Sequence, residues 1–486
     1  MRPGDFPHLL RARAGAISTA AALLALTLAV LLAVPAPGAP APVTSAAPPR
    51  ATLPLEEAAP DAAAALRVLV LVLPGIGAEQ AELALADGTL HHLARLAAQG
   101  VYLPILTPPE SGGTAWAGWA LSAGQGAGLP EDPEAGVTCT AWKEWNARAS
   151  PVWWEAEAAG HAAGLVLWPP FLPLGCARIA SAQVEGWVQD LPSAWEQVSL
   201  APAQDWQGLP FSYSEPLEGQ VSLPGDGQRT GRTLYLAVLD RRNDGVALYD
   251  HVLLTDDRDA PEAGVLFRTD GWADYWVLRE EGGAASFRVT EVQHGSHAAL
   301  TLYRSPAYHL EVRPPALRQE LLSATGPLAA PPDLEAWQQG WLTKGQVLEM
   351  TLRHERGFTK AVAFLQARGE LALLWVRWTP LARAWEVLGA LEPQGGEEAR
   401  RFLRQVDADL GTLLRRVDLS ATVVVVVFTP AQGDAKAGAC IAAGRGVRPG
   451  LVEGPTPAAE VAALVRALLG LGTPSKASLP GRVLEP

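Results

Sequence analysis

The chain has 486 residues, of which 49% are hydrophobic and 18% charged, and its formal net charge is −13. The length allows about two or three domains, or one large domain with an insertion, and the hydrophobic content excludes a disordered chain. The acidic balance argues against nucleic-acid binding, which requires a basic surface for the phosphates. Three cysteines, Cys139, Cys176 and Cys440, are too few for a disulfide framework or a cysteine-rich metal site. Two of the three cysteines could form one disulfide and leave the third as a free thiol, and the sequence does not identify the pair.

The N-terminus carries a membrane signal. Residues 14–34 contain no charged residue and follow three arginines, Arg2, Arg11 and Arg13. Such a run is long enough to cross a bilayer as a helix, and the arginines predict a cytoplasmic segment 1–13 with the rest of the chain outside. An uncleaved anchor is favoured over a cleaved signal peptide, because a proline, Pro37 or Pro42, follows each candidate cleavage site. With cleavage, the protein would be secreted.

Residues 35–65 are rich in proline and alanine and predict an extended linker between the membrane and the main domain. After it, buried strands are predicted at 67–73, 371–378 and 422–428, where aliphatic residues run without interruption. Helical spacing predicts helices near 90–97, 397–416 and 458–469. Strands that alternate with helices indicate an α/β fold with a mostly parallel sheet.

The segment 205–312 differs from its surroundings, because short alternating stretches are separated by Gly, Asp, Asn and Pro. It predicts a β-rich insertion with strands near 233–239, 246–254, 285–289 and 299–303. The α/β core would then consist of two parts, 66–204 and 313–486.

Ten stretches follow one another in an order that is typical of one family: Val68–Gly75, Leu90–Tyr102, Pro108–Trp116, Gly164–Pro170, Val184–Trp187, Leu302–Ser305, Glu320–Pro327, Gly444–Gly450, Ala467–Gly470 and Gly481–Leu484. Together they resemble the alkaline-phosphatase superfamily, and most closely its type I phosphodiesterase and nucleotide pyrophosphatase branch. The resemblance implies a three-layer α/β/α core with a mostly parallel sheet and a β-rich insertion. It also implies hydrolysis of phosphoric esters by two metal ions, usually zinc, that stabilise the attacking and leaving oxygens.

The ligand positions that the resemblance implies are not occupied by metal-binding residues. These positions fall on Pro74, Pro380, Ala384, Thr429, Pro430 and Ala435, where the family carries Asp or His. Zinc prefers Cys, His, Asp and Glu ligands, and the last of the nine histidines is His354, before most of these positions. The sequence therefore predicts that the metal site is lost and that no cofactor is bound.

The position of the family nucleophile falls on Ser111 when residues are counted from the start of the motif, and on Thr114 when they are counted back from its end. Either hydroxyl at a helix N-terminus could bind an anion, but capping of the helix is favoured. A hydroxyl without a metal ion or a neighbouring base is a weak nucleophile.

The remaining candidates have structural explanations that we favour. A metal site could be formed by His294 and His297 with Asp256 and Asp257, but a surface turn is favoured there. For His91 and His92, a structural role is favoured. Helix 397–416 predicts a solvated face, where Glu397, Glu398, Asp407 and Asp409 alternate with arginines. Tryptophans cluster before the second strand, at 116, 119, 142, 145, 153, 154 and 168. We expect these side chains to fill the core, and the alternative is an aromatic cleft that binds a sugar or a lipid.

The sequence thus predicts a membrane-anchored, extracytoplasmic, alkaline-phosphatase-like protein without catalytic activity. Its expected role is binding or scaffolding, and its partner could be a phosphorylated ligand, a glycan or a protein. One alternative is an active hydrolase of the phosphodiesterase type with a rearranged site, which would need zinc or another divalent metal. The other alternative is a structural subunit of a cell-surface assembly. The oligomeric state stays open.

Overall fold

The computed structural model describes residues 66–106, 150–168, 180–188, 191–224, 231–259, 263–278, 283–293, 298–389, 396–430, 437–452, 454–472 and 479–484. All of them belong to one compact unit, Asp61–Pro486. Within these ranges, no helix is both long and apolar enough to cross a bilayer. The predicted span 14–34 and linker 35–65 lie outside the described residues, so both stay predictions.

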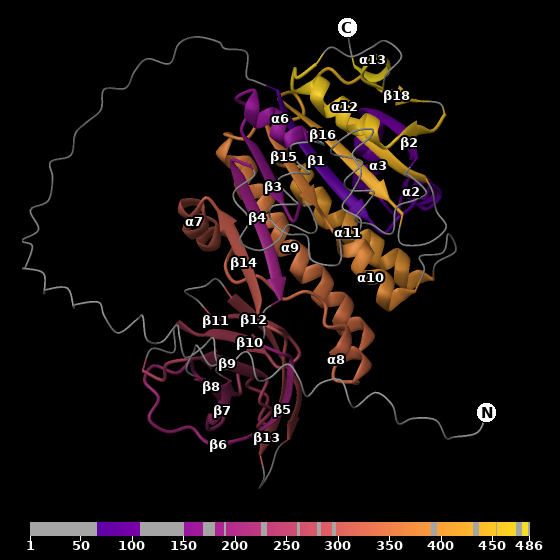
Figure 1. Ribbon diagram of the computed structural model, residues 1–486. Helices are drawn as coiled ribbons and strands as arrows, with labels where there is room; N and C mark the ends of the chain where they lie inside the picture. The colour runs from indigo at the N-terminus through magenta and orange to yellow at the C-terminus, as the bar shows by residue number, and fades with distance from the viewer. Residues whose placement is uncertain are drawn as a thin grey trace, which may run out of the picture. The chain divides into compact units, whose positions relative to one another are not determined.

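The centre of the large sheet is parallel and consists of strands in the order β16-β1-β15-β3-β4 (Figure 1). Their bounds are Arg67–Pro74 for β1, Ala163–Val166 for β3, Ala182–Val188 for β4, Leu373–Arg377 for β15 and Thr422–Thr429 for β16. Strands β1 and β16 are buried along almost their whole length, because helices cover both faces of the sheet there. The three strands predicted from uninterrupted aliphatic runs are confirmed.

Antiparallel strands extend both sides of this parallel centre. Beyond β16 lie β17 (Ala437–Ala443) and β2 (Val101–Leu106), which the short parallel strands β18 (Gly450–Leu451) and β19 (Thr456–Pro457) join. Beyond β4 lie β14 (Tyr308–Arg313), β12 (Gly283–Gln293), β13 (Ala299–Arg304) and β5 (Ala194–Ser199), with β11 (Ala273–Leu278) on β12.

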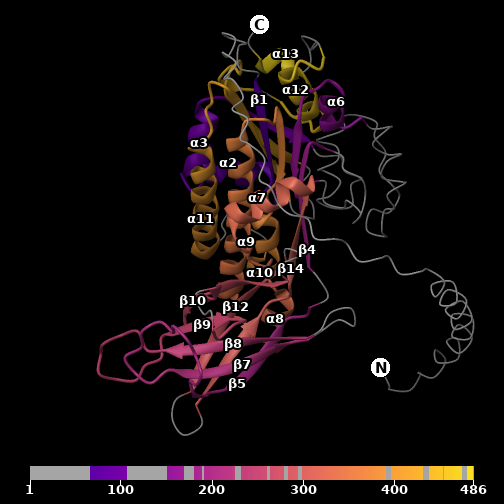
Figure 2. The ribbon, with the colours of Figure 1, turned by 90° about the vertical axis from the view of Figure 1, so that its left-hand side faces the viewer.

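Helices form a layer on each face of the sheet (Figure 2). One layer contains α2 (Ala78–Ala86), α3 (His91–Ala98), α7 (Pro315–Thr325), α8 (Leu334–Gln338), α9 (Lys344–Arg368), α10 (Pro380–Leu388) and α11 (Glu397–Leu414). The other contains α6 (Val152–Ala158), α12 (Ala459–Leu468) and α13 (Leu479–Val483). Along β1, Leu69, Leu71 and Leu73 pack into the first layer, whereas the intervening valines pack into the second. This is the predicted three-layer α/β/α core.

The segment 205–312 contains strands in its described residues, as the alternating pattern predicts. Five antiparallel strands form a second sheet: β6 (Ala201–Pro202), β7 (Leu217–Leu223), β8 (Arg232–Leu239), β9 (His251–Thr255) and β10 (Val265–Arg268). Strands β11 to β14 instead join the large sheet, and apolar residues of β11 to β13 share a core cluster with β7 to β10. The two sheets therefore bury one common apolar core.

The prediction that the charged face of α11 is exposed to solvent is wrong at Asp407. Its side chain is only 2% exposed and accepts hydrogen bonds from the backbone N–H groups of His92 (2.8 Å) and Leu93 (3.1 Å). Asp407 thus satisfies two free N–H groups in the first turn of α3. Glu397 pairs with Arg404 of the same helix, as predicted, whereas the side chain of Asp409 is only 18% exposed and pairs with Arg356 of α9.

Candidate functional site

Three of the positions that the family resemblance assigns to metal ligands meet at one edge of the sheet. They follow the carboxyl ends of β1, β15 and β16, which are neighbours in the sheet (Figure 1). Pro74 at the end of β1 pairs in register with Thr429 of β16, and the backbone N–H of Trp378, just after β15, donates to the carbonyl of Val72 (2.8 Å). In an open α/β sheet, this edge is where ligands usually bind.

The side chains at this edge do not fit a two-zinc site. Pro74, Pro380 and Pro430 carry no donor atom, and Ala384 is fully buried. Thr429 offers one hydroxyl, which is buried and has no hydrogen-bond partner among the residues that the structure describes. Throughout the described ranges, no group of three or more His, Cys, Asp or Glu side chains is placed to hold a metal ion. Ser111, Thr114 and Ala435 lie outside these ranges.

Helix α10 packs directly on the end of β1. A Cβ atom added to Gly75 would lie 2.5 Å from the backbone nitrogen of Ala382 and 2.7 Å from the carbonyl carbon of Leu381. Gly75 has φ of +110°, which also favours glycine, and its carbonyl accepts a hydrogen bond from the indole N–H of Trp385. The helix backbone therefore covers the strand end that the resemblance assigns to a metal ligand.

Beside this strand end lies a buried polar network centred on Glu355 of α9. The Thr379 hydroxyl donates to Glu355 Oε1 (2.7 Å), and the Arg383 Nε donates to Thr379 Oγ1 (3.1 Å) and lies 4.0 Å from Glu355 Oε1. Glu355 is 1% exposed, and burial raises its pKa while Arg383 opposes that rise. Burial and the neighbouring Arg383 lower the pKa of Arg377 to about 10. Both arginines thus interact electrostatically with the same buried carboxylate, and Arg383 lies 4.0 Å from it.

Two more polar side chains, His354 and Tyr308, lie close to this network, and each has one polar atom without a hydrogen-bond partner in the described residues. The His354 Nδ1 lies 2.7 Å from the Ala329 carbonyl oxygen, whereas its Nε2 has no partner in the described residues. Its ring packs edge-on against Tyr308 (centroids 4.8 Å apart), whose hydroxyl also has none. Burial lowers the pKa of His354 well below its usual range, so the imidazole is neutral.

The pair Thr379 and Glu355 has the chemistry of a hydroxyl nucleophile with a base. However, both side chains are buried (4% and 1% exposed), and the threonine oxygen already accepts from Arg383. A substrate has no access to the hydroxyl in this arrangement. The pairing was missed from sequence, because Glu355 lies on α9 and Thr379 lies just before α10, and no local pattern shows that the two side chains meet.

Two of the three clustered tryptophans that the structure describes fill the core, as predicted. Trp153 and Trp168 are fully buried and contact Trp375 of β15, with ring centroids 6.2 Å and 5.6 Å apart. Trp154 is 43% exposed on the opposite side of α6. The tryptophans at 116, 119, 142 and 145 lie outside the described ranges.

The remaining candidates are structural where they are described. His92 packs against Gly411 of α11, because a Cβ on that glycine would lie 2.4 Å from the imidazole ring. Asp256 pairs with Arg232 and accepts from the hydroxyl of Tyr275 (3.0 Å). Cys440 is buried and not in a disulfide. The pair His294 and His297, with Cys139 and Cys176, lies outside the described ranges.

Glu185 on β4 is expected to make stability depend on pH. Burial raises its pKa to about 7, and Glu311 lies directly opposite in the antiparallel pair with β14. Because the folded state holds a proton that the unfolded state releases above pH 4.5, stability falls as pH rises to about 7. A Glu185→Gln variant should lack this loss and gain at most about 3 kcal/mol over wild type between pH 4.5 and pH 8. Urea unfolding at several pH values measures it, and parallel curves for the two proteins would refute it.

No protein-family model matches the chain, and no curated protein matches its sequence. Among solved structures, a Bacteroides fragilis protein assigned as a sulfatase is 10% identical, with 88% of this chain and 80% of that chain covered and a TM-score of 0.38. The cofactor-independent phosphoglycerate mutase of Thermoplasma acidophilum is 12% identical, with 83% and 100% covered and a TM-score of 0.27. At these identities and scores, the family must be argued from the chain's own residues.

Proposed function

We propose that this chain is a non-catalytic protein with an alkaline-phosphatase-like fold that acts in binding or scaffolding outside the cytoplasm. One observation carries the proposal. The carboxyl ends of β1, β15 and β16 meet, as a two-metal site of this superfamily requires, yet the described family positions there, Pro74, Pro380, Ala384, Thr429 and Pro430, offer one buried hydroxyl and no carboxylate or imidazole. The motif order in the sequence supports the superfamily, and the position of these strand ends is consistent with it.

The packing at this edge supports the absence of catalysis. Two zinc ions a few ångströms apart need room and several charged ligands, whereas the backbone of α10 lies directly against Gly75. The carboxylate of Glu355 in the adjacent buried network accepts a hydrogen bond from the Thr379 hydroxyl and lies 4.0 Å from Arg383.

Membrane attachment through residues 14–34 is a further part of the proposal. An uncharged run preceded by arginines supports an anchor, with the linker 35–65 between the membrane and the folded unit. The anchor would hold the domain at the extracytoplasmic face of the cell membrane, where its partner is a phosphorylated ligand, a glycan or a protein.

Hydrolysis of chromogenic phosphate mono- and diesters by the full chain, with added zinc or manganese, tests the proposal. We expect no turnover above the buffer rate, while circular dichroism of the same sample shows a cooperatively folded protein. Turnover that a chelator abolishes would instead establish an active hydrolase with a rearranged site. A defined homo-oligomer without turnover or ligand would favour a structural subunit.

A further inference from the structure

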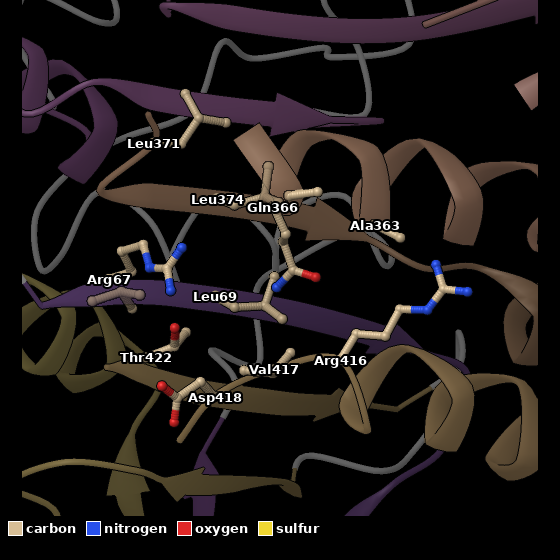
Figure 3. A pocket seen from close by; sticks show the side chains of 12 residues that line it. Arg67, Leu69, Ala363, Gln366, Leu371, Leu374, Arg416, Val417, Asp418 and Thr422 are labelled. Atoms are coloured by element: carbon tan, nitrogen blue, oxygen red, sulfur yellow. The ribbon is translucent and has the colours of Figure 1, made fainter. Parts of the chain in front are cut away.

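A pocket of about 150 Å³ lies at the opposite edge of the sheet from the candidate site, near the amino ends of β1 and β16 (Figure 3). Its apolar lining includes Leu69, Leu371, Leu374 and Val417, from β1, β15 and the segments that precede β15 and β16. An apolar cavity of this volume accommodates one benzene ring. The pocket can therefore hold a single ring or a short alkyl chain.

The opening of this pocket carries two arginine side chains for which the described part of the chain provides no hydrogen-bond partner. Figure 3 shows Arg67 and Arg416 on opposite sides, with Gln366 between them. Within the described residues, neither guanidinium makes a hydrogen bond or an ion pair. Asp418 adds one negative charge, but its Oδ1 already accepts from the backbone N–H (2.9 Å) and the hydroxyl (2.7 Å) of Ser420. The charged groups at the opening thus sum to one positive charge.

We propose that this pocket binds a small amphipathic anion, an apolar ring or short chain that carries one carboxylate or phosphate group. The apolar part lies against the leucines, and the anionic group accepts charge-assisted hydrogen bonds from one of the two guanidinium groups, Arg67 or Arg416, while the other adds electrostatic attraction. The amide of Gln366 can donate a further hydrogen bond. A cation of the same shape is disfavoured by the two guanidinium groups, and a neutral analogue lacks the charge-assisted hydrogen bonds.

Isothermal titration calorimetry of the full chain in lipid nanodiscs tests this site, with empty nanodiscs as the blank. The probes are benzoate, phenyl phosphate, benzyl alcohol and benzylamine. We expect at least one of the two anions to bind with a Kd of about 1 mM or lower, and the preferred anion distinguishes a carboxylate from a phosphate ligand. Benzyl alcohol should bind at least about fivefold more weakly, and benzylamine should not bind.

Variants connect the binding to this pocket. Of Arg67→Gln and Arg416→Gln, the variant that removes the contacting arginine should weaken binding of the anion about fivefold to tenfold and the other should weaken it less, and Ala363→Phe should block it by filling the apolar part. Arg415→Gln is the matched control, because Arg415 is the exposed neighbour of Arg416, does not line the pocket and donates to Thr412. Its affinity should equal that of wild type. The proposal is overturned if neither anion binds, if benzylamine binds as tightly, or if the arginine variants retain wild-type affinity.

Discussion

Replacing Glu355 with alanine is expected to lower the free energy of unfolding by about 3 kcal/mol. The change removes the carboxylate that the Thr379 hydroxyl contacts at 2.7 Å and leaves Arg383 and Arg377 without their shared counter-charge. Breaking a buried ion pair from one side costs about 3–5 kcal/mol. The lower end applies because the Arg383 side chain is 28% exposed and can turn toward water. Urea unfolding measures the change.

The matched control is Glu349→Ala on the same helix. Glu349 is 49% exposed and lies 3.6 Å from Arg288, so its removal should cost at most about 1 kcal/mol. Glu355→Gln, which keeps an acceptor for Thr379, should fall between the two. Equal losses at Glu355 and Glu349 would show that the buried network contributes no more than a surface ion pair.

Replacing Gly75 with alanine is expected to cost about 2–5 kcal/mol of unfolding free energy. The φ of +110° alone strains an L-residue by about 1–2 kcal/mol. The added Cβ would also lie 2.5 Å from the backbone nitrogen of Ala382, and overpacking of this kind costs about 1–3 kcal/mol. The same urea titration measures the loss.

Gly88→Ala separates the two causes. Gly88 has φ of +78°, and a Cβ there would meet no atom within 4 Å, so only the backbone strain of about 1–2 kcal/mol should remain. If Gly75→Ala costs no more than Gly88→Ala, then α10 does not pack on the end of β1. The space for a metal site would then be open.

The fold was predictable from sequence where a local pattern determines it. The aliphatic runs of β1 and β16 are fully buried, and the helical spacing at 397–416 predicted α11 within two residues. Both patterns report which faces of an element are covered, and this depends on the element's own residues. The alternating stretches of 205–312 likewise predicted strands, but not that these divide between two sheets, because the pairing partners are distant in the chain.

Single buried polar residues were not predictable. Asp407 looks like its neighbours on a charged helix, yet it contacts backbone N–H groups 314 and 315 residues away. Glu355 likewise follows a helical pattern and acquires its environment only when α9 packs beside α10. By contrast, the convergence of Pro74, Pro380 and Thr429 followed from the motif order, because parallel neighbouring strands end at the same edge.

Zinc content tests the central claim most directly. The full chain would be purified without chelator, incubated with excess zinc, passed through a desalting column and measured by elemental analysis against protein concentration. We predict well below one zinc ion per chain, because the described strand ends carry prolines, a buried alanine and one threonine hydroxyl where ligands would stand. Two tightly bound zinc ions per chain would contradict the claim and support the alternative of an active hydrolase with a rearranged site.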